Sequence, residues 1–170
     1  MKESFPNLVD PITRYPLKKI TKSGVDVLIS KNGTEFKIIE GIPRILPESD
    51  NYADAFGQQW LKWRKTQLDS HSRTKISSSR LNRCLGKDII KLFLGQQPMQ
   101  VLEVGCGAGR FTEILLKYPA VNLTSTDLSL AVEANQMNFP QDNRHRIVQS
   151  DIMNSPFEDN VFDVVLCIGV

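Results

Sequence analysis

The stretch VLEVGCGAGRF at residues 101–111 constrains the fold of this chain more than any other. An apolar run typical of a strand carries Glu103 and meets three glycines at alternate positions, Gly105, Gly107 and Gly109. Glycine lets the backbone adopt a positive φ and lets a ligand come close to the main chain. A strand that ends in such a turn and continues into a helix favours an α/β fold that binds its ligand at the carboxyl ends of the strands.

The sequence after residue 98 alternates between two hydrophobic patterns. Predicted strands lie at residues 100–105, 122–127, 145–151 and 162–169, and predicted helices at 110–118 and 130–139. Strands that alternate with helices imply right-handed crossovers and a parallel sheet. We therefore predict an α/β protein with a Rossmann-like parallel sheet over residues 99–170.

Two further regions precede this sheet. Residues 1–48 read as a small β-rich module, because β-rich pieces flank Asn32-Gly33, a dipeptide that favours a hairpin turn. Residues 49–98 read as a helical linker. In it, Phe56, Trp60 and Trp63 form one stripe of a helix.

The rest of the linker contains a polar stretch and a second helix. Residues 69–80 are Ser-rich and predict a mobile connection. Residues 81–94 predict an amphipathic helix that buries Leu85, Ile89, Leu92 and Phe93.

Composition excludes several classes of protein. Residues 1–98 hold 17 Lys and Arg against 10 Asp and Glu, and residues 99–170 hold 4 against 9. The basic residues are scattered, so a nucleic-acid-binding domain is not indicated. The sequence has no stretch of signal-peptide type and no apolar run long enough for a membrane helix, which predicts a cytoplasmic protein without membrane contact. Three separated cysteines predict neither a disulfide framework nor a zinc site.

The glycine spacing separates two kinds of nucleotide-binding loop. A dinucleotide fingerprint would place its third glycine at the position of Arg110, so a nicotinamide-dependent oxidoreductase is disfavoured. The pattern E-x-G-x-G-x-G, from Glu103 to Gly109, resembles the first motif of class I S-adenosylmethionine-dependent methyltransferases, of the methyltransferase type 11-like group. Asp127 and Asp151, each at the end of a later strand, extend this resemblance.

The resemblance implies S-adenosylmethionine as the cofactor and a role for each matching residue. Glu103 would orient the methionine amino group, directly or through water, Asp127 would bind the ribose hydroxyls, and Asp151 would accept from the adenine amino group. Each aspartate could instead cap the element that follows it. The other residues implied in cofactor binding are Gly105, Cys106, Gly107, Gly109, Leu128, Ile152 and Ile168. No general base is indicated, because His71 and His145 are lone histidines.

The front of the chain resembles the zinc-ribbon-like module that precedes some bacterial methyltransferase domains. The pieces LVDPITRYPL and GIPRILP carry this likeness. Asp10, Thr13 and Ser30 stand where the module has cysteines, and hydroxyl groups are poor substitutes for thiolates. We predict a degenerate module without metal. The helix around Trp60 resembles the segment that joins the module to the core, and we expect it to form a lid over the cofactor.

The chain carries four strands of a core that has seven in this family. We therefore expect the acceptor half of the sheet to be missing and the fourth strand to be an exposed edge that pairs with a partner or with a second copy. The sequence predicts a methyltransferase, impaired by this loss, with a small-molecule acceptor of unknown identity. The alternative is a non-catalytic binding or regulatory module derived from such an enzyme.

Overall fold

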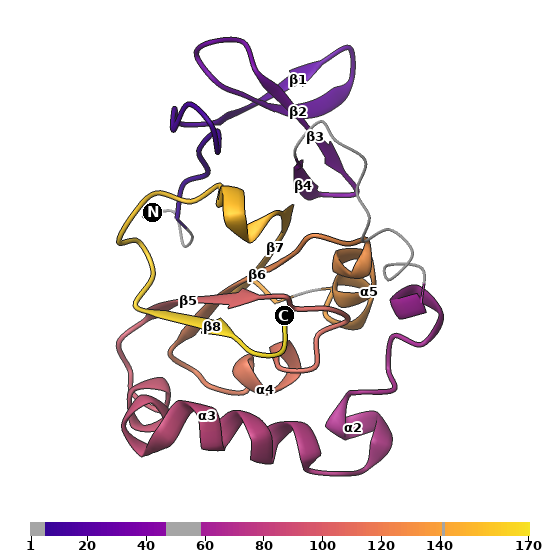
Figure 1. Cartoon of the computed structure of the whole chain (residues 1–170), viewed down its shortest axis with the longest axis vertical. Coiled ribbons are helices and arrows are strands. Elements are labelled where there is room, and N and C mark those ends of the chain that lie inside the picture. The colour runs from indigo at the N-terminus through magenta and orange to yellow at the C-terminus, as the bar shows by residue number, and fades with distance from the viewer. Residues whose placement is uncertain (1–5, 47–58, 141) are drawn as a thin grey trace.

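The protein is described by a computed structural model over residues 6–46, 59–140 and 142–170. Its strands form one eight-stranded sheet in the order β1-β2-β3-β4-β7-β6-β5-β8 (Figure 1). The strands are β1 (Lys18–Lys22), β2 (Val25–Ile29), β3 (Glu35–Ile39), β4 (Ile42–Ile45), β5 (Met99–Val104), β6 (Val121–Asp127), β7 (His145–Ser150) and β8 (Val164–Cys167).

The strands β5 to β8 form the parallel half of the sheet, in the order β7-β6-β5-β8. The helices α4 (Thr112–Leu115) and α5 (Ala131–Asn138) lie in the connections from β5 to β6 and from β6 to β7. A 3₁₀ turn, η1 (Ile152–Asn154), follows β7. The predicted α/β class with a Rossmann-like parallel sheet is confirmed.

The strands β1 to β4, with residues 6–17 before them, form the part that we call the β-module. Its strands pair antiparallel in sequence order, and β2 and β3 form the hairpin predicted at Asn32-Gly33. The last strand, β4, pairs parallel with β7, through Arg44 opposite Gln149 and Ile45 opposite Ser150. Because of this pairing, the β-module continues the parallel sheet beyond its β7 edge (Figure 1).

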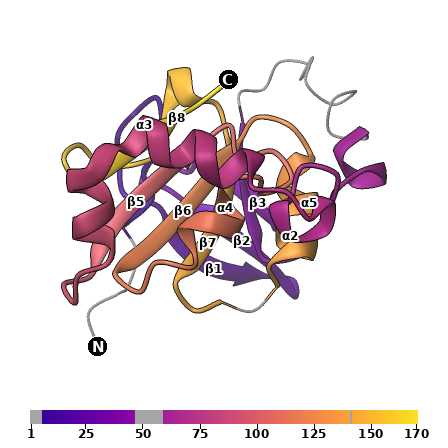
Figure 2. The ribbon, with the colours of Figure 1, turned by 90° about the horizontal axis from the view of Figure 1, so that it is seen from below.

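Alternate residues of the central strands supply the core on each face of the sheet. On one face, Val101 and Leu123 pack with Leu81 and Leu85 of α3 (Ile76–Phe93) and with Leu115 of α4. Figure 2 shows α3 crossing this face. The opposite face is covered by a second cluster, whose buried members are Leu8, Leu28, Ile45, Leu102, Val104, Val148 and Phe157.

The helix α3 differs from its prediction in where it begins and in which side chains it buries. It begins at Ile76, inside the stretch predicted to be a mobile connection, and Gly86 has a non-helical φ of 73° within it. This kink interrupts the helical period, so the residues beyond it follow a different face. Leu92 is accordingly 53% exposed, which makes its predicted burial wrong, whereas Phe93 is fully buried.

A buried aspartate explains why the Ser-rich stretch is ordered. Asp69 lies in the short helix α2 (Asp69–Ser72), and its two carboxylate oxygens accept hydrogen bonds from the backbone N–H groups of Ser77 and Ser78, at 2.9 and 2.8 Å. These are unsatisfied donors of the first turn of α3. The carboxylate caps α3 from outside the helix, a contact that local sequence does not reveal.

The three residues that replace the cysteines of a zinc-ribbon-like module lie in the β-module. Asp10 and Ser30 are buried. Asp10 Oδ1 accepts from the backbone N–H groups of Ile12 and Thr13, at 2.9 and 3.1 Å, and Ser30 Oγ contacts the side chain of Asn32. Within the described ranges, no three His, Cys, Asp or Glu side chains are grouped closely enough to hold a metal ion.

The strand β8 lies at the edge of the sheet opposite the β-module. Although its sequence is apolar throughout, only alternate side chains of β8 are partly buried. Leu166 packs against the α3 face, whereas Val165 and Cys167 are exposed. Among the described helices, none has the length and apolar character needed to cross a membrane.

Candidate functional site

A cavity of about 380 Å³ lies where β5, β6 and β7 end. We call it the carboxyl-end pocket. Its volume falls in the usual range for small-ligand sites. It is lined by Trp60, Val104, Gly105, Thr126, Asp127, Leu128, Ser129, Ser150, Asp151, Ile152, Met153 and Val170. In an open α/β sheet, this is the edge at which ligands bind.

Asp127 stands at the end of β6 and faces the glycine turn. Its Oδ2 accepts a hydrogen bond from the backbone N–H of Gly107 at 2.9 Å, and its Oδ1 accepts from the N–H and the hydroxyl of Ser129, at 2.9 and 2.7 Å. The carboxylate therefore ties the turn after β5 to the turn after β6. It also lines the pocket, so the capping contact and a ligand role are compatible.

Asp151 is the first residue after β7 and makes the capping contacts that the sequence left as an alternative. Its Oδ1 accepts from the backbone N–H of Met153 at 2.9 Å, and its Oδ2 accepts from Asn154 Nδ2 at 3.1 Å. Asp151 and its neighbour Ile152 line the pocket as well. The two acids thus stand at the ends of adjacent parallel strands.

The glycines of the turn are crowded in different ways. At Gly105, an added Cβ would lie 2.3 Å from Cγ2 of Val170, a pocket residue. At Gly109, it would lie 2.3 Å from Cε2 of Phe139, where α5 ends. Gly107 has Trp60 near it, 3.9 Å from the position of a Cβ. The absence of a side chain at Gly105 leaves room at the pocket. Its absence at Gly109 lets the end of α5 pack against the turn.

Glu103 lies behind the turn, 2% exposed, on the face of the sheet that carries the helices. Its Oε2 accepts hydrogen bonds from the hydroxyls of Thr112 and Ser125, at 2.6 and 2.9 Å. Ser125 Oγ also lies 3.0 Å from Nε2 of His145, and Thr112 Oγ1 accepts from Asn135 Nδ2 at 3.0 Å. The second carboxylate oxygen, Oε1, is buried and has no hydrogen-bond partner among the described residues.

Burial controls the charge state of this network. It raises the pKa of Glu103 to about 7, against the hydrogen bonds from Thr112 and Ser125, which favour the ionised form. It lowers the pKa of His145 to about 4, so the imidazole is neutral near pH 7. Burial also raises the pKa of Cys106 well above its ordinary value, which leaves that thiol protonated.

The structure places five of the ten predicted site residues in the pocket lining: Gly105, Asp127, Leu128, Asp151 and Ile152. The other five line no part of it. Glu103, Cys106, Gly107 and Gly109 form or support the turn behind it. Ile168 packs against the apolar cluster beneath α3.

Sequence reasoning missed the hydroxyl residues at the strand ends. Thr126 and Ser150 precede the two acids in sequence, and their hydroxyl oxygens lie 2.5 Å apart inside the sheet. Both line the pocket, as do Ser129 and Met153. Their signal in the sequence was a small polar residue directly before each strand-end aspartate.

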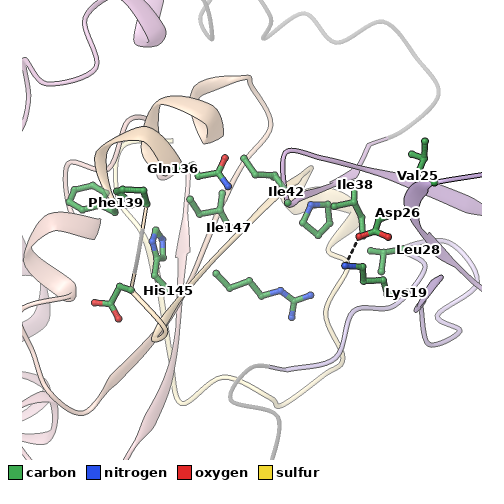
Figure 3. Close-up of a pocket in the computed structure, with 16 residues that line it drawn as sticks. Lys19, Val25, Asp26, Leu28, Ile38, Ile42, Gln136, Phe139, His145 and Ile147 are labelled. Atoms are coloured by element: carbon green, nitrogen blue, oxygen red, sulfur yellow. Dashed lines mark ion pairs between the residues drawn. The ribbon is translucent and has the colours of Figure 1, made fainter. Parts of the chain in front are cut away.

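A larger hollow, about 760 Å³, lies between the β-module and the α5 edge of the sheet; we call it the groove. Figure 3 shows Phe139, His145 and Ile147 on one side of it and the Lys19–Asp26 ion pair on the other. Its charged side chains, Lys19, Asp26, Asp142 and Arg146, carry both signs. The groove is separate from the strand ends, and none of its lining residues belongs to the carboxyl-end pocket.

The charges of the carboxyl-end pocket indicate which ligands it suits. Among its described lining side chains, the charged ones are Asp127 and Asp151, and none is basic. A pyrophosphate needs donors or positive charge, whereas a ligand that carries cationic groups is favoured beside carboxylates. The two carboxylates therefore fit a positively charged nucleoside better than a dinucleotide.

Comparison with known proteins finds similarity to methyltransferases over part of the chain. Residues 102–170 match the family described as methyltransferase domain. An uncharacterized protein of Methanocaldococcus jannaschii is 33% identical over 82 residues, which are 48% of this chain and 33% of that protein. A malonyl-[acyl-carrier protein] O-methyltransferase of Legionella pneumophila is 34% identical over 76 residues, 43% of this chain and 26% of that protein.

A solved structure from Methanococcus maripaludis, described as an S-adenosylmethionine-dependent methyltransferase, is 22% identical, with a TM-score of 0.46. The match covers 70% of this chain and 52% of that one. The matched part thus spans a third or less of the length of the curated relatives. The domain match indicates similarity to methyltransferase domains over residues 102–170.

Proposed function

We propose that this chain carries the cofactor-binding part of an S-adenosylmethionine-dependent methyltransferase, with the cofactor in the carboxyl-end pocket. The observation that carries the proposal is the pair of aspartates that flank this pocket at the ends of adjacent strands, beside the glycine turn and without a basic lining side chain. The match of residues 102–170 to methyltransferase domains supports it.

In this proposal, Asp127 binds the ribose hydroxyls, Asp151 accepts from the adenine amino group, and Glu103 orients the methionine amino group. Because Glu103 lies behind the turn and outside the pocket lining, it would act on the amino group through water, with Oε1, which has no hydrogen-bond partner among the described residues, as the acceptor. When bound, the cofactor supplies an activated methyl group on a sulfonium. The contribution of the chain is then to align this methyl group with its acceptor, since orientation is a large part of the acceleration of such a transfer.

The acceptor in this proposal is a small molecule. A non-catalytic binding module is the second candidate, and one observation favours it. Apart from Asp127 and Asp151, which the proposal assigns to the cofactor, the described lining of the pocket contains no side chain that could serve as a general base. Cofactor binding without methyl transfer to any of a panel of amines, hydroxyl compounds and carboxylates would favour the second candidate.

The proposal predicts saturable binding of S-adenosylmethionine that depends on Asp127. In calorimetric titrations, replacing Asp127 with Ala should raise the Kd at least about 100-fold, because two charge-assisted hydrogen bonds of roughly 1.5–3 kcal/mol each are lost. NADH should not bind. The control is Asp142→Ala, which removes an acid of the groove. No binding by the folded wild-type chain, or equal affinity in the Asp127 variant, would contradict the proposal.

Trp60 should contribute to the same site as part of a lid. It lines the pocket, near Gly107 of the turn. Trp60→Ala is expected to raise the Kd for S-adenosylmethionine about fivefold or more, since an aromatic contact with the ligand is lost. Trp63→Ala is the matched control, because Trp63 is 54% exposed and lies outside the pocket lining. If both variants bind like the wild type, Trp60 is no lid.

A further inference from the structure

The β-module is connected to the carboxyl-end pocket through one buried arginine. Arg44 lies on β4, opposite Gln149 of β7, and is 9% exposed. All four residues of β4 are buried, so the guanidinium lies inside the joint between the β-module and the parallel strands. A charged side chain in such a place has to be explained by its partners.

Arg44 makes two directed contacts across the joint. Its Nη1 donates to Oε1 of Gln149 at 2.9 Å, and its Nη2 donates to Oε1 of Glu133 at 2.8 Å. Gln149 in turn donates from Nε2 to the backbone carbonyl of Leu128 at 2.9 Å. Because Arg44 can only donate, it fixes which way the Gln149 amide points and so presents the NH₂ group to Leu128.

Both contacts end on the segment that shapes the pocket. Leu128 follows Asp127 directly, and both line the pocket. Glu133 lies in the first turn of α5, the helix that this segment enters. One guanidinium therefore holds the strand-end turn at its start, through Gln149, and at its end, through Glu133.

Stability alone is a weak reason for this arrangement. Arg44 Nε is buried and finds no hydrogen-bond partner in the part of the chain that the structure describes. Burying a charge and leaving a donor unsatisfied is costly, and an apolar side chain of similar size often serves a core equally well. What an apolar side chain could not do is fix the orientation of the Gln149 amide and the position of the Leu128 carbonyl.

We propose that Arg44 is a positioning residue for the cofactor pocket, through which the β-module holds the Asp127–Leu128 turn in its binding geometry. This inference rests on the proposed function, in that the ligand used to test it is S-adenosylmethionine. It gives the β-module a part in the site, although the β-module supplies none of the described lining residues of the pocket.

The first test compares ligand affinity in two arginine variants of the full chain. R44M keeps the size and apolar stem of the side chain, and its Kd for S-adenosylmethionine should rise about tenfold while cooperative unfolding is retained. R14A is the matched control: Arg14 also lies in the β-module and donates to the carbonyls of Ser155 and Phe157, outside the pocket lining. It should lose stability yet bind within twofold of the wild type.

A double-mutant cycle with Q149L tests the route. If Arg44 acts through Gln149, R44M combined with Q149L should bind no more weakly than the weaker single variant. Fully additive losses would overturn the proposed route, and R44M binding within twofold of the wild type would overturn the positioning role.

A measurement without ligand separates this inference from the proposed function. The N–H groups of Gly107 and Ser129 donate to Asp127, and the N–H of Leu123 donates to the carbonyl of Arg144 away from this turn. In R44M, amide exchange of the first two should accelerate about tenfold more than that of Leu123. Equal acceleration at all three would show a global loss of stability and overturn the inference, whether or not the wild type binds S-adenosylmethionine.

Discussion

Replacing Gly109 with Ala is expected to lower the free energy of unfolding by about 2 to 5 kcal/mol. Gly109 has a φ of +99°, which costs an L-residue roughly 1–2 kcal/mol. The new Cβ would also stand 2.3 Å from Cε2 and 3.1 Å from Cδ2 of Phe139, and 3.4 Å from Cγ of Asn135. Moving a packed ring away adds about 1–3 kcal/mol.

Gly33→Ala separates these two costs. Gly33 has a φ of +91° in the hairpin between β2 and β3, and, apart from its chain neighbours, no described residue has an atom within 4 Å of the position of its Cβ. Its replacement should cost only the backbone share, about 1–2 kcal/mol. Urea unfolding of both variants measures the difference. If both variants lost the same free energy of unfolding, the Phe139 ring would move away without cost, and the packing of α5 against the turn would not contribute to stability.

The second large effect concerns the buried hydrogen-bond network that contains Glu103 and His145. Variants of these two residues are expected to show opposite pH dependence of the free energy of unfolding. The pKa of Glu103, raised to about 7, means that the folded state keeps a proton that the unfolded carboxyl releases near 4.5. Its contribution to stability is therefore present below pH 4.5 and is lost as the pH rises to 7. The pKa of His145, lowered to about 4, works in reverse, since that contribution is present above pH 6.5 and is lost as the pH falls to 4.

Between pH 4.5 and 6.5 the two slopes oppose each other, each about 1.4 kcal/mol per pH unit. Glu103→Gln leaves only the histidine contribution, so the free energy of unfolding should fall by about 2 kcal/mol when the pH is lowered from 6.5 to 4.5, since the full slope is reached only in the middle of this window. His145→Gln leaves only the contribution of the Glu103 carboxyl, so its free energy of unfolding should fall when the pH is raised from 4.5 to 6.5. The wild type should change little by comparison.

Urea unfolding at pH 4.5, 5.5 and 6.5 gives both slopes. The pKa values of Asp10, Asp26 and Asp69 are lowered from 3.8, so their loss of stability lies below this window and affects all three proteins alike. If the free energy of unfolding changed with pH in the same direction in both variants, the assigned pKa shifts of Glu103 and His145 would be wrong.

Local sequence pattern was sufficient for the parallel strands and for the acids at their ends. The apolar run before Gly105 and the strand-end positions of Asp127 and Asp151 follow from period-two alternation and from the punctuation of turns. The structure brings these three residues to one pocket because the carboxyl ends of parallel strands share one edge of the sheet.

What the sequence did not predict depends on contacts between distant residues. Asp69 orders the start of α3 from outside that helix, and the kink at Gly86 changes which side of it is buried. The pairing of β4 with β7 joins residues more than 100 positions apart. A strand of four residues with an internal proline has no periodicity that would identify its partner, so the link from Arg44 to the pocket required the structure.

We propose that the carboxyl-end pocket, and not the larger groove, binds S-adenosylmethionine. The most direct test is the shift of backbone amide resonances in ¹⁵N-labelled protein during titration with S-adenosylmethionine. Saturable shifts are expected at Gly105, Leu128 and Ile152 of the pocket, with the amides of Gly24 and Gly41 in the groove unchanged. Shifts confined to the groove residues, or no shifts in a folded chain, would contradict this proposal.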